Sequence, residues 1–257
     1  MNVRDLFDLS GRVAIVTGGG SGIGRQMAEA LAELGADLVL CARRPERCEQ
    51  AAEEIAGLGV RALGLRCDVS DRAEVDALVA RTVAEFGHVD IVINNAGASW
   101  GAPAVDHPLE AWNKVMAVNL TGVFLVSQAA GRVMIERGGG KIVNVSSTAA
   151  FGALPPELMD AVAYTASKGG VLALTRDFAV KWARYGIYVN ALAPGWFPSE
   201  MSRSLLEHRA EGLLAEIPLG RFGGPHDLKG AVAFLAAAAS DFVTGQVIVI
   251  DGGQTAR

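Results

Sequence analysis

The chain has 257 residues, of which 51% are apolar, and its 23 basic and 28 acidic side chains give a formal net charge of −5. This length allows a large buried core, and the composition excludes a disordered chain. The basic side chains form no cluster, so we expect no nucleic-acid partner. Arg4, Asp5 and Asp8 interrupt the N-terminal stretch, which lacks a signal-peptide core, and no apolar run approaches the length of a membrane span.

Cysteine and histidine usage predicts a cytoplasmic protein without a metal centre. The three cysteines, Cys41, Cys48 and Cys67, are an odd number and form no Cys-x-x-Cys motif. We therefore expect free, mostly buried thiols in a reducing compartment. The four histidines are scattered without ligand spacing, and we expect them on the surface or in loops.

Seven short runs are rich in Val and Ile and nearly continuous in apolar character, as are strands buried on both faces. They span residues 13–17, 37–42, 60–67, 89–95, 141–147, 187–194 and 246–251. Helical patterns that end at glycine lie between the first runs, at residues 23–35, 45–59 and 71–87. This alternation predicts an α/β fold with one domain over residues 1–257: a Rossmann-like, doubly wound, seven-stranded parallel sheet with helices on both faces.

The stretch "TGGGSGIG" at residues 17–24 follows the first predicted strand and opens the first helix. Glycines allow a tight turn and a close approach of pyrophosphate, and the helix N-terminus supplies free N–H groups. The spacing is not the commoner Gly-x-Gly-x-x-Gly, so a bare tight turn is the alternative. Its place after the first strand favours a dinucleotide site. The predicted cofactor-binding residues here are Gly18, Gly20, Ser21, Gly22, Ile23 and Gly24.

The end of the second predicted strand indicates which dinucleotide is bound. An NAD site usually has an acidic side chain there, but this chain has Ala42, followed by Arg43 and Arg44. Guanidinium groups suit a 2′-phosphate, so we expect NADP(H) in preference to NAD(H), with Arg43 the stronger candidate. The alternative is that both arginines merely decorate a helix start, where the helix dipole disfavours cations. Asp68, after the third strand, is expected either near the adenine or as an ordinary turn cap.

The stretch "AVAYTASKGG" at residues 161–170 places Tyr164 and Lys168 four positions apart. On a helix this spacing puts both side chains on one face. Tyrosine alone titrates near ~10, too high for a base at neutral pH, but a nearby ammonium favours the phenolate. Such a pair could exchange a proton with an alcohol or a ketone.

Residues 195–225 leave the sixth predicted strand in a long excursion before the last helix and strand. Ligands bind at the carboxyl ends of strands in open α/β sheets, so this segment is predicted to be a substrate-binding lid. The alternative is a helical insertion that only packs on the periphery.

At this point the chain resembles the short-chain dehydrogenase/reductase family nearly from end to end. The motifs, in the family's order, are "TGGGSGIG", "CDV" (67–69), "NNAG" (94–97), "VNLTGVF" (118–124), "VNVSS" (143–147), "YTASK" (164–168), "APG" (193–195) and "VIDGG" (249–253). The resemblance implies a catalytic set in which Ser147 orients the substrate oxygen, with Ser146 the second choice, and Tyr164 is the acid/base beside Lys168. It also implies that Asn119 completes a proton relay to Lys168; a locally bonded helix residue is the alternative. The further cofactor-binding residues it implies are Asp68, Val69, Asn95, Ala96, Gly97, Tyr164, Lys168, Pro194, Gly195, Trp196, Ser199 and Met201.

Two features depart from the family's pattern. Ser199 stands where threonine is usual and Trp196 where a small aliphatic residue is usual. Ser147 and Tyr164 are seventeen residues apart, several more than usual, and the extra residues fall in the loop 151–163. Prolines stiffen this loop. We expect its residues Glu157, Met159 and Asp160 to face the substrate; the alternative is a looped-out surface insertion.

Together these features predict an NADP(H)-dependent oxidoreductase that interconverts a ketone and a secondary alcohol. The small-molecule substrate is expected to be a sugar acid or polyol. The alternative, a 3-oxoacyl thioester on an acyl carrier protein, is weakened by the mixed charges of the predicted lid, and a non-catalytic cofactor-sensing protein by the presence of Tyr164 and Lys168. The resemblance also implies a homotetramer, a dimer of dimers, built through the fourth and fifth helices and the last strand.

Overall fold

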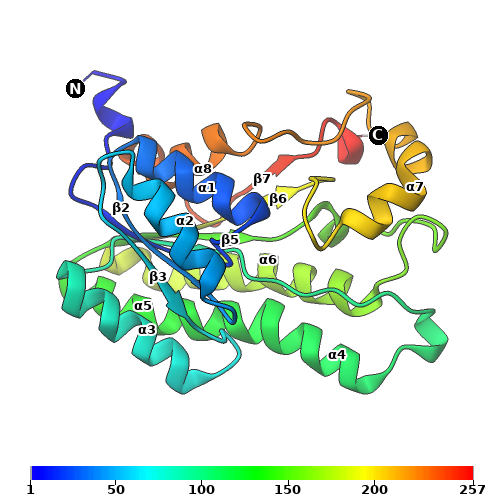
Figure 1. Ribbon diagram of the computed structural model, residues 1–257, viewed down its shortest axis with the longest axis horizontal. Coiled ribbons are helices and arrows are strands. Elements are labelled where there is room, and N and C mark those ends of the chain that lie inside the picture. The colour runs from blue at the N-terminus through cyan, green and yellow to red at the C-terminus, as the bar shows by residue number, and fades with distance from the viewer. Residues whose placement is uncertain (1, 257) are drawn as a thin grey trace.

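Seven parallel strands pair side by side in the order β3-β2-β1-β4-β5-β6-β7, as the computed structural model, which describes residues 2–256, shows (Figure 1). The strands are β1 (Val13–Thr17), β2 (Asp37–Ala42), β3 (Ala62–Arg66), β4 (Ile91–Asn94), β5 (Gly140–Val145), β6 (Ile187–Pro194) and β7 (Val247–Ile250). The predicted doubly wound sheet is confirmed. Four of the seven predicted runs extend one or two residues too far, because their apolar or small residues continue into the turns at the strand ends.

Two layers of helices cover the sheet (Figure 1). The helices are α1 (Gly22–Glu33), α2 (Glu46–Ala56), α3 (Arg72–Phe86), α4 (Leu109–Met116), α5 (Gly122–Arg137), α6 (Val162–Trp182), α7 (Arg203–Ala215) and α8 (Lys229–Ala236). Short helical turns are η1 (Asp5–Phe7), η2 (Ala104–Asp106), η3 (Ala117–Thr121, a π-helix), η4 (Thr148–Ala150), η5 (Ala183–Tyr185), η6 (Ala238–Ser240) and η7 (Gln254–Ala256). Helices α1, α2 and α8 pack on one face, and α3, α5 and α6 pack on the other.

Strand β1 shows why the apolar runs are continuous. Val13 and Ile15 belong to the core under α3, α5 and α6, whereas Ala14 and Val16 belong to the core under α1, α2 and α8. All four are at most 1% exposed. Successive residues of a strand point to opposite faces, so a sheet covered on both faces needs apolar residues at every position.

The strand order indicates where a ligand would bind to this sheet. The chain returns past β1 to form β4 on its other side, so the loops after β1 and β4 diverge at their carboxyl ends. Ligands of doubly wound sheets bind at such a switch point.

One helical stretch within residues 2–256, Leu109–Arg137, is long and apolar enough to cross a membrane by length and composition alone. In its most apolar window 61% of the surface is buried inside the protein. Core helices of globular proteins pass the same test, so this stretch gives little support for a membrane span.

Candidate active site

A continuous cleft of about 1460 Å³ opens along the carboxyl ends of β1, β4, β5 and β6. Ligand pockets are ordinarily about 300–1,000 Å³, so this cleft has room for a dinucleotide and a small substrate together. Most of the predicted site residues line it: Gly18, Ser21, Gly22, Ile23, Gly24, Asn95, Ala96, Gly97, Ser147, Tyr164, Lys168, Pro194, Gly195, Trp196, Ser199 and Met201.

The glycine-rich turn lies at one end of the cleft, and its backbone packs too tightly to leave space for side chains. A Cβ atom on Gly24 would lie 2.3 Å from the Gly18 carbonyl oxygen and 2.4 Å from Asn95 Nδ2, and Gly18 has φ +66°. Only glycine fits these two positions without a shift. Gly20 does not line the cleft; its Cβ would lie 2.9 Å from Cys48 N, so it lets the turn pack on α2.

Contacts from the end of β4 hold this turn in place. The Asn95 and Ala96 N–H groups each donate to Thr17 Oγ1 at 3.0 Å, and Asn95 Nδ2 donates to the Thr17 carbonyl oxygen at 2.9 Å and the Gly18 carbonyl oxygen at 3.2 Å. The sequence analysis did not predict this role for Thr17. The available signal was a polar residue at the end of an otherwise apolar strand. With the backbone fixed and the N-terminus of α1 beside it, the turn fits a pyrophosphate.

The end of β2 carries exposed arginines. Arg43 and Arg44 follow Ala42 there, outside the residues that line the cleft. The Asp68 carboxylate accepts hydrogen bonds from Ser70 N at 3.0 Å and Ser70 Oγ at 2.6 Å, so it caps a turn. Burial acts to raise the pKa of Asp68, but these hydrogen bonds and the charges of Arg43 and Arg66 outweigh it and lower the pKa.

Val69 is also outside the cleft lining. Its side chain is buried, with Cγ2 2.8 Å from the position of a Cβ atom on Gly122. It packs the turn after β3 against the start of α5.

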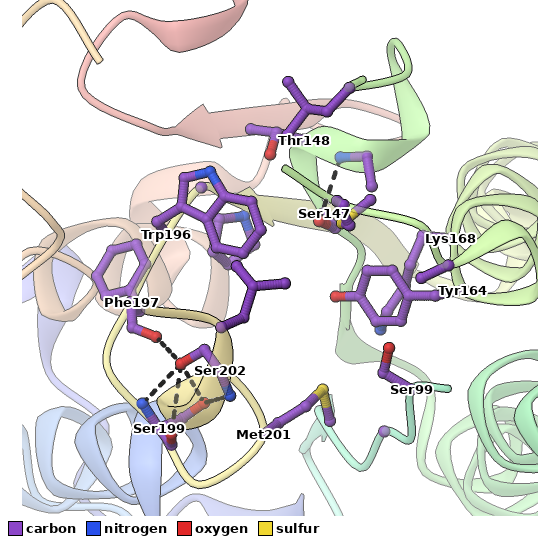
Figure 2. A pocket seen from close by; sticks show the side chains of 18 of the residues that line it. Ser99, Ser147, Thr148, Tyr164, Lys168, Trp196, Phe197, Ser199, Met201 and Ser202 are labelled. Atoms are coloured by element: carbon purple, nitrogen blue, oxygen red, sulfur yellow. Dashed lines mark hydrogen bonds between the residues drawn. The ribbon is translucent and has the colours of Figure 1, made fainter. Parts of the chain in front are cut away.

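Tyr164 and Lys168 lie together on the first turns of α6, as their spacing predicts (Figure 2). Lys168 Nζ donates to the Val145 carbonyl oxygen at 2.7 Å and lies 5.6 Å from the centre of the Tyr164 ring. Burial lowers the pKa of Lys168 to about 8. Burial also raises the pKa of Tyr164, an effect that a hydrogen bond with Ser147 partly opposes. Burial therefore favours the neutral form of both side chains: the ammonium loses its proton more readily, and the phenol keeps its proton.

The two serines at the end of β5 have different partners. Ser146 is buried and donates its hydroxyl to the Lys168 carbonyl oxygen at 2.9 Å. Ser147 accepts from Ala149 N at 3.2 Å and interacts with the Tyr164 phenol. The geometry therefore favours Ser147 over Ser146 for contact with a substrate.

Asn119 lies fully buried in the π-helical turn η3 and does not line the cleft. Its Oδ1 accepts from Ala98 N at 2.7 Å, and its Nδ2 donates to the Ala98 carbonyl oxygen at 2.9 Å and to Ser167 Oγ at 3.0 Å. The alternative of local bonding within its own helix is wrong. The side chain instead joins the loop after β4 to α6, at the residue before Lys168.

The segment after β6 crosses the cleft. Three of its consecutive residues contact three different parts of the protein. Ser199 Cβ lies 3.4 Å from the position of a Cβ on Gly22, Glu200 pairs with Arg47 Nη1 of α2 at 2.5 Å, and Met201 Cε lies 3.6 Å from the position of a Cβ on Gly97. We call residues 199–201 the strap. Arg47 and Glu200 were not predicted as site residues, although Arg47 is the third arginine of "RRPER".

The Ser199 hydroxyl is already engaged within its own turn. It lies 3.0 Å from Ser202 Oγ, which donates to the Phe197 carbonyl oxygen at 2.7 Å (Figure 2). These contacts set the curvature of the strap.

The other end of the cleft is lined by the loop before α6 and by α7. Met159 and Asp160 line the cleft as expected, but the expectation for Glu157 is wrong: it is exposed on the turn at the tip of the loop and does not line the cleft. Further lining residues were not named individually from the sequence; among them are Phe151 in this loop, Ser204, Leu205, His208 and Arg209 in the predicted lid, and Gln254 and Thr255 in η7. They come from three separate segments and carry no shared motif.

No group of three or more His, Cys, Asp or Glu side chains within residues 2–256 is placed to hold a metal ion. The free thiols of Cys41, Cys48 and Cys67 are buried, as expected.

A parallel doubly wound sheet, a glycine turn that opens the first helix and a cleft at the switch point define a dinucleotide-binding protein of the Rossmann type. Tyr164 and the buried Lys168, which line another part of the same cleft, add groups that can exchange a proton.

Comparison with known proteins gives the family. A family model described as enoyl-(acyl carrier protein) reductase matches residues 18–255. The chain is 40% identical to 5-keto-D-gluconate 5-reductase of Escherichia coli K12 over 255 residues, 98% of each chain. It is 40% identical to D-threitol dehydrogenase of Mycolicibacterium smegmatis over 252 residues, 98% of this chain and 95% of that one. A gluconate 5-dehydrogenase from Burkholderia cenocepacia, solved with NADP and tartrate, superimposes with a TM-score of 0.94 at 42% identity over all of both chains. The chain belongs to the short-chain dehydrogenase/reductase family.

Proposed function

We propose that this protein is an NADP(H)-dependent oxidoreductase that interconverts a ketone and a secondary alcohol on a sugar acid or polyol. One observation carries the proposal: the partly buried Tyr164 and the buried Lys168 lie in the same cleft that begins at the glycine-rich turn. The full-length relatives that act on 5-keto-D-gluconate and D-threitol support the substrate class.

The residues at the cofactor end fit NADP(H). The turn at Gly18 and Gly24 leaves no space for side chains and would hold the pyrophosphate with its backbone, beside the N-terminus of α1. No carboxylate stands at Ala42, and the exposed guanidinium of Arg43 next to it would bind the 2′-phosphate. The NADP complex of the Burkholderia enzyme supports this choice.

The proposed chemistry uses the chain's own groups for the proton. When bound, the nicotinamide supplies or accepts the hydride. Tyr164 donates its phenolic proton to the carbonyl oxygen in reduction and removes the hydroxyl proton in oxidation. The Ser147 hydroxyl donates to the same substrate oxygen and orients it. The Lys168 ammonium, held by the Val145 carbonyl, favours the phenolate, and Asn119 positions this part of α6 through Ser167.

The strongest alternative is reduction of a 3-oxoacyl thioester on an acyl carrier protein; the description of the family model also names an acyl carrier protein substrate, although an enoyl thioester. Against it, the acidic and basic side chains around α7 are paired or mixed: Glu200 pairs with Arg47, and Arg221 pairs with Asp227. An acidic carrier protein would find no clear basic surface there.

We also propose that residues 195–225 act as a substrate lid within the single domain 1–257. Ser204, Leu205, His208 and Arg209 of α7 line the cleft, which supports this role.

A homotetramer is proposed for the assembly. The outer edge of β7 is partly exposed, with Val249 at 37%, and Val180 on α6 is 81% exposed. A shallow apolar groove between α3 and α5, lined by Val79, Val83, Ala129 and Val133 among others, offers a second surface. Light scattering that gave a monomer mass of 26.8 kDa would contradict this assembly. A cytoplasmic location agrees with the three free thiols.

The decisive experiment is a substrate panel. Sugar acids, polyols, their ketones and a 3-oxoacyl thioester are assayed with NADPH, NADH and the oxidised cofactors. We expect turnover of 5-keto-D-gluconate or a polyol such as D-threitol with the NADP couple. Turnover of the thioester alone would replace this proposal by the alternative, and no hydride transfer to any carbonyl would refute it.

A further inference from the structure

The substrate end of the cleft contains one arginine among the described residues that line it, Arg209 of α7. The other cationic side chains there have different partners. Lys168 donates to the Val145 carbonyl, and His208 lies with Nδ1 2.6 Å from the Ser204 carbonyl oxygen. Arg209 therefore supplies the permanent positive charge at the end of the cleft away from the glycine turn.

Arg209 is held in an unusual local geometry. Its backbone, with φ −130° and ψ 17°, interrupts the regular helix α7. Its Nη1 donates to the Pro156 carbonyl oxygen at 3.0 Å, across to the loop before α6. Leu158 of the same loop packs one turn further along, with Cδ2 2.8 Å from the position of a Cβ atom on Gly212. The helix and the loop thus contact each other at two points, the Arg209 guanidinium and Gly212.

The remaining donors of this guanidinium have no partner within residues 2–256. A guanidinium has five N–H donors, and a single hydrogen bond, to Pro156, uses one of them within the described part of the chain. Asp160 and Glu216 also line the cleft, but no carboxylate among residues 2–256 lies within ion-pairing distance of Arg209. A charged group that faces a ligand cleft and lacks a counter-ion is suited to an anionic ligand.

We propose that Arg209 is the residue that binds the carboxylate of the substrate and so selects sugar acids over neutral polyols. This inference rests on the proposed function, because it assigns an orientation to that same substrate. The bond to the rigid Pro156 carbonyl holds the guanidinium plane, which leaves a two-pronged donor edge for a carboxylate. Asp160 would repel the carboxylate and accept hydroxyl hydrogens, so the polyol part of the substrate lies on its side of the cleft.

The test compares Arg209→Gln with Arg203→Gln, a matched loss of charge on the same helix outside the cleft lining. Loss of a charged hydrogen bond costs about 1.5–3 kcal/mol, which corresponds to about 10- to 100-fold in affinity. We expect Arg209→Gln to raise KM for 5-keto-D-gluconate by that factor and to change KM for D-threitol less than about two-fold. Arg203→Gln should leave both KM values unchanged. Arg209→Lys should recover part of the loss, because it restores the charge without the fork.

A binding measurement separates this inference from the proposed function. Isothermal titration of D-gluconate into each protein with NADP present needs no turnover. Weaker gluconate binding in Arg209→Gln and not in Arg203→Gln sustains the carboxylate assignment even if no oxidoreductase activity is found. Equal gluconate binding in wild type and Arg209→Gln, no binding to wild type, or an equal rise in KM for D-threitol would overturn it. NADPH binding and circular dichroism of Arg209→Gln report whether the variant is folded.

Discussion

The two ends of the cleft are built in different ways. At the cofactor end, the Thr17 and Asn95 side chains bond to backbone atoms at the ends of β1 and β4, and glycines leave no room for further side chains. At the substrate end, two segments outside the sheet, the loop before α6 and helix α7, meet through side chains such as Arg209 and Leu158. Hydrogen bonds between two strand ends and the glycine backbone fix the first end, and contacts between two segments outside the sheet fix the second.

This difference explains which end of the cleft tolerates changes of residue type. A glycine turn that is hydrogen-bonded to two buried strands tolerates almost no substitution. It suits the pyrophosphate, a group that all dinucleotides share. A loop and a helix that meet at a few side chains can change their residues without disturbing the sheet, so they are the natural place for substrate selection. The proposed catalytic pair, Tyr164 and Lys168, lies between them on α6, which contacts β5 and η4.

The largest effect on activity is expected at Tyr164, which lies between the two ends of the cleft. Tyr164→Phe removes the proposed acid/base and should lower kcat by about 10²- to 10⁴-fold, with NADPH affinity nearly unchanged. Tyr185→Phe, in η5 and outside the cleft lining, is the matched control. Steady-state carbonyl reduction measures both. A Tyr164→Phe variant at the wild-type rate would rule out the catalytic assignment.

The next effect is confined to the cofactor end. Arg43→Ala should weaken NADPH binding by about 10- to 100-fold, because one charged hydrogen-bonding partner of the 2′-phosphate is lost. NADH binding should change little, and Arg44→Ala should have a smaller effect. Fluorescence titration of the two nucleotides measures the ratio. Equal weakening of NADPH and NADH would show that Arg43 does not read the 2′-phosphate.

A third prediction concerns the effect of Lys168 on the free energy of unfolding. Lys168 is 4% exposed, and burial lowers its pKa to about 8, so the charged side chain destabilises the folded protein without cofactor at neutral pH. Lys168→Met should abolish activity but raise Tm by a few degrees. Calorimetry at several pH values measures this, and a lower Tm at pH 7 would contradict it.

The pH dependence of that gain follows from the direction of the pKa shift. Below pH about 8 the lysine is protonated in both the folded and unfolded states, so the folded wild type carries the full cost of burying the charge. As the pH rises from about 8 towards the unfolded value near 10.4, the folded state releases its proton first and wild type gains stability. The advantage of Lys168→Met should therefore shrink above pH 8.

The smallest effect is expected where the strap crosses the cofactor end. Glu200 and Arg47 are both about half exposed, so their ion pair is screened by solvent. Glu200→Gln should speed NADPH release by at most a few-fold, and the difference should disappear at high salt. Stopped-flow displacement of NADPH measures the rate. A much larger acceleration would mean that the strap, and not the glycine turn, dominates cofactor retention.

Most of the cofactor end could be predicted from the sequence, because its determinants are local. Gly18 and Gly24 need their residue type for backbone reasons, and Tyr164 and Lys168 share a helix face by spacing alone. Asp68 shows the limit: its sequence position allowed two roles, and hydrogen bonds to Ser70 reveal the turn cap. Asn119 shows it again, since its partners Ala98 and Ser167 are distant in the sequence.

The sequence by itself determined the doubly wound sheet, the glycine turn and the tyrosine–lysine pair, because apolar periodicity, glycine conformation and helical spacing act over a few residues. Only the tertiary structure decided that Arg209 faces the cleft while Glu157 does not, and that Glu200 meets Arg47. Such contacts join segments far apart in the chain, and their geometry depends on how α7 and the loop before α6 pack. No local pattern records that packing, so substrate selection is determined at the level of the assembled fold.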